Sequence, residues 1–201
     1  MKKKFLFSII FLGLTALFCS GQDYTSVSAG GWYGWGTSLD DYFLSGSAEP
    51  LDLEGQCSGG NARLEAALPR GWYTLGLWLD YTGSYLLTGG EFDVLRRVDL
   101  SIGGTARVSA FRYAQPYVSL GLLYADYLLF VPHHPSNSPV LYLWGLRFAG
   151  GILSEIFSLD FQSFELAFQA GPEYVLEMLF SDTAIFLHEI RGRVGLEMRF
   201  R

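Results

Sequence analysis

One short segment of the chain brings together residue types that can do chemistry, His133-His134-Pro135-Ser136-Asn137. A serine hydroxyl becomes a nucleophile when a neighbouring base takes its proton, so His134 and Ser136 are the candidate base and nucleophile. A third group must orient the histidine, but the next carboxylate along the chain is Glu155. Two adjacent histidines supply at most two metal ligands. We therefore expect an ordinary loop, no metal site, no cofactor and no enzyme.

The composition is hydrophobic without being that of a helical membrane protein. The 201 residues are 50% hydrophobic, 16% aromatic and only 17% charged, which is enough chain for one domain. Beyond the N-terminus no apolar run is long enough for a spanning helix, and this combination is typical of alternating transmembrane strands. A soluble β-sandwich rich in aromatic residues is the alternative. The net charge of −6 argues against nucleic-acid binding.

The N-terminus has the pattern of a secretory signal peptide. Three lysines precede an apolar run that ends at Phe18, and small residues follow at Ser20 and Gly21. We expect residues 1–21 to be removed and residues 22–201 to form the single domain. Cys19 offers a lipoprotein alternative, although Phe18 before it is bulky. If Cys19 is removed, Cys57 is left without an internal disulfide partner.

Alternation of apolar and polar residues predicts about eight strands after the signal peptide. The clearest lies between Trp72 and Tyr81, where a row of leucines is bracketed by two tyrosines, as expected for a strand that crosses a bilayer. Pro172 interrupts another strand and predicts a bulge there. The predicted strands cover residues 26–35, 61–68, 72–81, 94–108, 117–130, 142–151, 163–176 and 186–200.

The connections between these strands mostly alternate between long and short, with Ile152–Asp160 longer than this pattern predicts. Those assigned to one side, expected to be the outside, are Thr37–Gly60, Thr82–Glu91, Val131–Pro139 and Leu179–Ile185. Those assigned to the other side are a Pro69 turn, Ser109–Ala114 and Ile152–Asp160. An even number of strands brings both termini to the periplasmic side, as in small outer-membrane barrels.

The last stretch, Ile190 to Phe200, alternates an apolar row with a nearly unbroken charged row and ends on an aromatic residue. It resembles the C-terminal strand of bacterial outer-membrane β-barrels, with Arg201 as a small departure. The resemblance implies an all-β fold, a closed antiparallel up-and-down transmembrane β-barrel like the eight-stranded OmpA- and OmpW-like proteins. It also implies export to the cell outer membrane. The implied partners are the lipid bilayer, periplasmic chaperones and the barrel-assembly machinery, which would read Phe200.

The inner rows of such a barrel carry charges of both signs, which can pair across the narrow lumen. We expect a packed polar core there, with a gated ion path as the alternative. These inner rows also contain Asp80, Glu173 and Arg199. On the outer rows, the predicted aromatic belt comprises Trp35, Tyr73, Tyr81, Tyr142 and Tyr174. The predicted lumen charge network comprises Arg63, Glu65, Asp99, Arg107, Arg147, Glu165, Glu189, Arg191, Arg193 and Glu197.

His134-x-Ser136-Asn137 is similar to a motif of the outer-membrane lipid A deacylases, in which a glutamate orients the histidine. The topology expected here puts Glu155 near the opposite membrane face, which is a departure from that family. The leading functional hypothesis is a non-enzymatic surface protein whose outside loops, chiefly Thr37–Gly60, contact the environment or a host ligand. Transport of small hydrophobic molecules, as proposed for OmpW-like barrels, and a lipid-modifying hydrolase are the alternatives.

Overall fold

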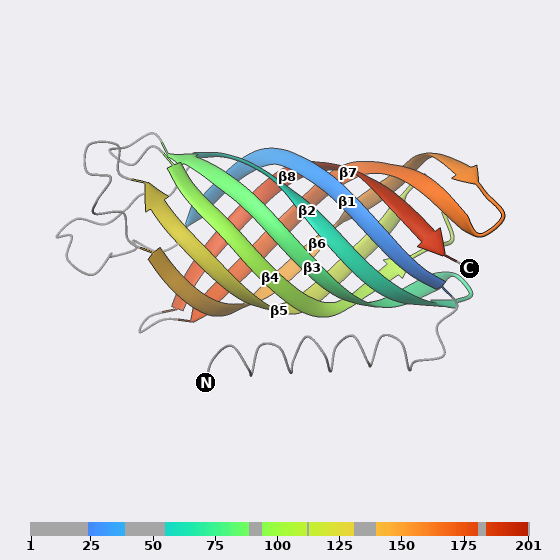
Figure 1. Cartoon of the computed structure of the whole chain (residues 1–201), viewed down its shortest axis with the longest axis horizontal. Helices are drawn as coiled ribbons and strands as arrows, with labels where there is room; N and C mark the ends of the chain where they lie inside the picture. The colour runs from blue at the N-terminus through green and yellow to red at the C-terminus, as the bar shows by residue number, and fades with distance from the viewer. Residues whose placement is uncertain are drawn as a thin grey trace.

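The computed structural model describes residues 24–38, 55–88, 94–111, 113–130, 140–180 and 184–200. The described residues form eight strands, each antiparallel to its chain neighbours, and β1 pairs with β8 to close a barrel (Figure 1). The predicted fold class is therefore confirmed. The predicted signal peptide, residues 1–21, lies outside the described residues. The strands are β1 (Tyr24–Ser38), β2 (Gly55–Arg70), β3 (Tyr73–Thr88), β4 (Val94–Val108), β5 (Gln115–Phe130), β6 (Val140–Asp160), β7 (Phe164–Phe180) and β8 (Ala184–Phe200).

Alternate side chains of each strand point out of the barrel and into its lumen. On β3, Leu77 is 48% exposed on the outer wall whereas its neighbour Trp78 is 1% exposed inside. The core of the protein is thus the lumen itself, while the outer wall presents apolar side chains. Among the described residues, no helix has the length and hydrophobicity needed to cross a membrane.

Apart from β4, the strands are longer than the alternating pattern suggested. The expected loop Thr37–Gly60 was wrong at both ends, because β1 runs to Ser38 and β2 begins at Gly55. The expected loop Thr82–Glu91 was also too long, since β3 continues to Thr88. Likewise β7 and β8 include Leu179, Phe180 and Ala184. Both errors at β2 and β3 have one cause: the polar and glycine-rich residues there are held by pairing with strands on both sides, as in Gly34↔Cys57↔Leu86.

The expected connection Ile152–Asp160 is not a loop either. It is the second half of β6, which pairs with β7 as far as Asp160↔Glu165 and then turns at residues 161–163. The β6–β7 hairpin therefore projects beyond the other turns at the end of the barrel where the C-terminus lies (Figure 1). The bulge predicted at Pro172 was misplaced. The register of β7 against β6 and β8 is the same on both sides of Pro172, and the shift in register lies in β6, between Glu155 and Phe157.

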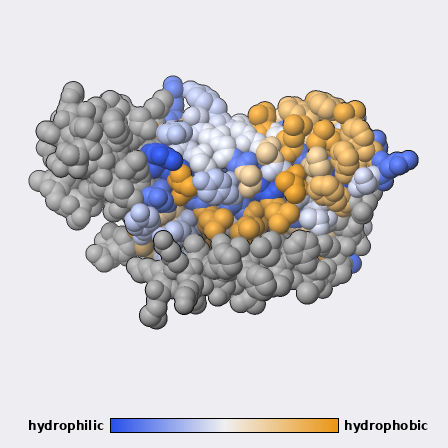
Figure 2. Space-filling model, in the orientation of Figure 1, coloured by the Kyte–Doolittle hydropathy of each residue, from blue (hydrophilic) through white to orange (hydrophobic). Residues whose placement is uncertain are grey.

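The three connections at this end are the β2–β3 turn, the β4–β5 connection at 109–114 and the β6–β7 turn, and we call it the turn end. Gly71 in the β2–β3 turn has a φ of 70°, which an L side chain rarely adopts. Hydrophobic side chains gather on the outer surface of the barrel where the β6–β7 hairpin projects (Figure 2).

Candidate functional site

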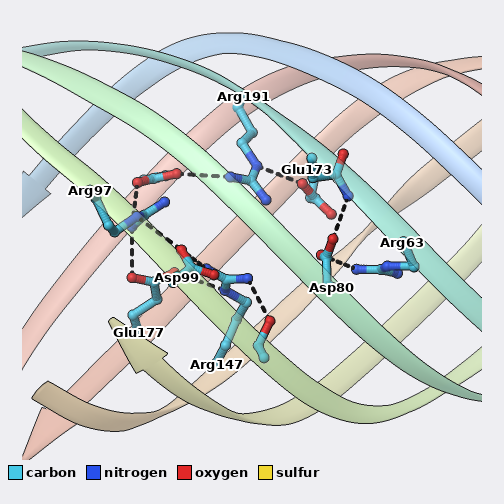
Figure 3. Close-up of polar contacts among 11 residues, drawn as sticks. Arg63, Asp80, Arg97, Asp99, Arg147, Glu173, Glu177 and Arg191 are labelled. Atoms are coloured by element: carbon cyan, nitrogen blue, oxygen red, sulfur yellow. Dashed lines mark hydrogen bonds and ion pairs between the residues drawn. The ribbon is translucent and has the colours of Figure 1, made fainter. Parts of the chain in front are cut away.

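The inner rows of the barrel meet in a network of ion pairs. Its centre is formed by Arg97 and Asp99 of β4, Arg147 of β6 and Glu177 of β7, which we call the central cluster (Figure 3). Arg147 donates from Nε to Glu177 at 2.8 Å and from Nη2 to Asp99 at 2.7 Å. Arg97 approaches Glu177 to 2.7 Å and Asp99 to 3.3 Å. Each of the four side chains is at most 4% exposed, so the charges are removed from water and neutralise one another.

A line of ion pairs leads from the central cluster across the lumen. Arg97 contacts Glu189 of β8 at 3.1 Å, and Glu189 accepts from Arg191 at 3.0 Å. Arg191 also donates from Nε to Glu173 of β7 at 2.6 Å, and Arg193 lies 3.6 Å from the same carboxylate. Charged groups on β4, β7 and β8 are thereby joined in one continuous chain.

Two tryptophan rings fill the lumen beside these charges. The guanidinium of Arg191 lies 4.3 Å from the ring centre of Trp32, and that of Arg63 lies 4.6 Å from the ring centre of Trp78. Both distances are those of cation–π contacts. Arg63 also pairs with Asp80 at 3.0 Å (Figure 3).

Inward-facing glycines provide the space that these rings occupy. A Cβ built on Gly59 would lie 2.5 Å from the Trp32 ring, and one built on Gly121 would lie 2.5 Å from the Trp78 ring. Gly103 abuts the Trp78 ring in the same way. These glycines thus do not leave empty pockets; they accept the rings of residues from other strands.

At the turn end the lumen opens into a polar cavity of about 350 Å³. Arg199 of β8 spans it, contacting Glu197 at 2.7 Å, Glu155 at 3.1 Å and Glu165 at 3.3 Å. The cavity is lined by Thr74, Arg107, Ser109, Gln115, Glu155, Ser158, Asp160, Glu165 and Arg199.

Every residue proposed for the lumen charge network takes part in an ion pair inside the barrel. Arg107, for example, lies 3.9 Å from Glu65 and 3.8 Å from Glu197. Among the described residues, seven guanidinium groups and nine carboxylates pair in this way, so the interior charges nearly balance. The arrangement ties distant strands together across the lumen.

Three members of this network were not among the residues predicted from the sequence. Arg97 lies two residues before Asp99 on β4, so both side chains point into the lumen. Extending the predicted inner row of this strand by one residue would have included Arg97. Glu177 was missed because the strand containing it was ended at Leu176, and Glu155 because its segment was read as a loop.

The residues proposed as an aromatic belt all lie on the outer wall, but not all at strand ends. Tyr73 begins β3, and Trp35 and Tyr142 lie near strand ends. Tyr81 lies in the middle of β3 because that strand continues past the leucine row. Tyr174 also lies mid-strand, where its hydroxyl is hydrogen-bonded to Nδ1 of His188 on β8. Phe200 is on the outer wall beside Phe164, with ring centres 6.4 Å apart.

The catalytic candidates His134 and Ser136 lie outside the described residues, so the hydrolase hypothesis stays a prediction. Within the described residues, no group of three or more His, Cys, Asp or Glu side chains is placed to hold a metal ion. Cys57 is buried and not in a disulfide.

Comparison with known proteins identifies the fold but no close relative. No protein-family model matches the chain, and no curated protein matches it. Among solved structures, Neisserial surface protein A is similar with a TM-score of 0.50 at 14% identity over 85% of this chain and 95% of that one. Ail of Yersinia pestis has a TM-score of 0.49 at 12% identity over 88% and 99%, and OprG of Pseudomonas aeruginosa 0.46 at 12% over 90% and 97%. The chain has the fold of the small outer-membrane β-barrels.

Proposed function

We propose that this protein is exported through its N-terminal segment and spans the bacterial outer membrane as a closed, non-enzymatic barrel. Its turn end faces the periplasm, and the opposite end, which carries the two longest connections between strands, faces outward. Those connections, chiefly the one between β1 and β2, contact the environment or a host ligand. The observation that carries the proposal is that the outer wall is apolar whereas the charged side chains of the lumen pair with one another.

The outer wall supports the membrane location. Leu120, Leu122 and Val118 on β5 are 50–64% exposed, and Ile190 on β8 is 68% exposed. A continuous apolar wall in water would be unfavourable, because transfer of each large apolar side chain out of water stabilises the protein by about 1.5–3 kcal/mol. Acyl chains provide that environment, and a closed barrel leaves few backbone groups unpaired in it.

The side chains in the lumen support the proposal that the barrel does not conduct ions. The central cluster and the two tryptophans lie across the bore, and eight strands enclose a space that side chains can fill. Ions would have to break buried pairs to pass, which costs several kcal/mol.

Two measurements test this proposal. In a diderm host the protein should fractionate with the outer membrane and migrate faster on a gel when it is not boiled. In planar bilayers it should give no single-channel steps. A soluble exported protein with identical boiled and unboiled migration contradicts the barrel, and regular unit conductance contradicts the closed lumen.

One observation favours transport of small hydrophobic molecules as a second candidate. An apolar groove of about 390 Å³ lies on the outer wall at the turn end, lined by Trp72, Tyr73, Ala106, Arg107, Val108, Pro116, Tyr117 and Val118. The β4–β5 pairing ends beside it at Arg107↔Tyr117, next to Pro116, which has no N–H to donate. Arg107 and Tyr117 also face the lumen, so the groove borders side chains that reach the interior of the barrel. Faster uptake of an apolar fluorophore into vesicles containing the protein, abolished in Val118→Trp but not in Leu77→Trp, would establish this route.

A further inference from the structure

The apolar groove on the outer wall at the turn end has a positively charged residue beside it. Arg70, the last residue of β2, is the pairing partner of Tyr73, and Tyr73 lines the groove. Tyr73 is in turn the partner of Val108 on β4, which also lines it. Neighbouring strands lie about 4.8 Å apart, so the backbone of Arg70 is about 10 Å from that of Val108 along this row.

The charge of Arg70 differs from the arginine charges of the lumen. Arg70 is exposed, and within the described part of the chain it makes no hydrogen bond or ion pair. A guanidinium group has five N–H donors and binds phosphate oxygens well. Arg70 can therefore bind an anion that the surroundings supply.

The rim of the turn end carries exposed aromatic side chains. Trp72 is 65% exposed, Phe111 65% and Tyr113 70%. The β2–β3 turn is also fixed against the β4–β5 connection, since the backbone amides of Ser109 and Ala110 donate to the carbonyl oxygen of Trp72 at 2.9 and 3.2 Å. Aromatic rings gather where acyl chains meet headgroups, so the groove lies just inside that boundary of the membrane.

We propose that this groove binds one phospholipid molecule of the periplasmic leaflet, with an acyl chain along Val108 and Val118 and the phosphate beside Arg70. The proposal rests on the membrane location proposed above. The groove volume of about 390 Å³ lies within the range of small-molecule sites, about 300–1,000 Å³. A phospholipid carries both parts that the surface fits, a hydrocarbon chain for the groove and a phosphate for the arginine. Passage of another apolar molecule through the groove would require this lipid to leave.

The experiment uses the full chain in detergent micelles, titrated with phosphatidylglycerol and followed by native mass spectrometry. One lipid should bind saturably. Val118→Trp should weaken binding at least about tenfold, because its indole would displace several methylene groups of the acyl chain and the burial of two is worth about that factor. The matched control is Leu77→Trp, which enlarges an outer-wall residue outside the groove and should leave the affinity within about twofold.

The phosphate contact is tested with a second pair of variants. Arg70→Gln should weaken binding of phosphatidylglycerol about fivefold, whereas Arg96→Gln, which replaces an exposed arginine near the other end of the barrel, should not. Diacylglycerol has no phosphate, so Arg70→Gln should leave its binding unchanged. Glycerol 3-phosphate has no acyl chain and should not displace the lipid.

The position of the lipid is tested in the wild-type protein. Phosphatidylglycerol with a photoreactive group in its acyl chain, added below one molecule per barrel, should crosslink within residues 72–73, 106–108 and 116–118. Crosslinks spread around the barrel, equal weakening by the two tryptophan or the two glutamine variants, or displacement by glycerol 3-phosphate would each overturn the proposal. Each protein is first shown to be a folded barrel by heat-modifiable migration, so these failures are distinct from failure of the barrel itself.

Discussion

Replacing Arg147 with methionine keeps most of the side-chain volume and removes one charge from the central cluster. Asp99 and Glu177 each lose their contact with Arg147 at 2.7 or 2.8 Å. Arg97 is then the one cation of the cluster beside three carboxylates, those two and Glu189. Removing one partner of a buried ion pair costs about 3–5 kcal/mol, so we expect the free energy of unfolding to fall by that amount.

The matched control is Arg96→Met. Arg96 precedes Arg97 on β4 but points outward and is exposed, so its replacement should change the free energy of unfolding by less than about 0.5 kcal/mol. Adding Asp99→Asn to Arg147→Met removes a carboxylate that has lost its partner. We expect the double variant to be more stable than the sum of the single losses by about 1–3 kcal/mol.

The assay is urea unfolding in lipid vesicles, followed by gel migration and by the fluorescence of the lumen residues Trp32 and Trp78. The reasoning is refuted if Arg147→Met and Arg96→Met lose equal stability, or if Asp99→Asn adds its full loss to that of Arg147→Met.

Three further predictions use the same unfolding assay. Gly103→Ala should cost about 1–3 kcal/mol, because its Cβ would press on the β5 backbone at Leu120 and Gly121 and on the ring of Trp78, whereas the outward-facing Gly104→Ala has its nearest contact at 3.6 Å and should cost little; equal losses would contradict this. Leu77→Lys places a charge on the outer wall and should cost about 2–4 kcal/mol in vesicles, and a loss near zero would argue against lipid contact there. Tyr117→Phe removes the hydroxyl that hydrogen-bonds a buried carboxylate and should cost about 1–3 kcal/mol, with no loss as the contradicting result.

Much of the barrel could be predicted because its information is local. The alternation around Leu77 on β3 and around Val194 on β8 shows which side chains point outward without any knowledge of neighbouring strands. The same alternation along β4 and β6 predicted that the side chains of Asp99 and Arg147 point into the lumen. One amphipathic period per strand is sufficient for those assignments.

The strand ends and the ion-pair partners could not be predicted because they depend on register. Gly59 belongs to a strand since Trp32 of β1 fills the space above it, and nothing within residues 55–60 reports that contact. Arg199 meets Glu155 only because β6 continues past β5 and shifts its register at Ile156. Such partners are distant in sequence and are brought together by closure of the barrel.

A nitroxide scan along β3 tests the central claim most directly. Single spin labels would replace each residue from Leu75 to Tyr81 in a Cys57→Ser background, with the protein in lipid vesicles. The account predicts that labels at odd-numbered positions are mobile and accessible to lipid-dissolved oxygen, while labels at Trp78 and Asp80 are immobile and protected from it. Equal oxygen accessibility at odd and even positions would contradict a barrel whose alternate side chains face lipid and a filled lumen.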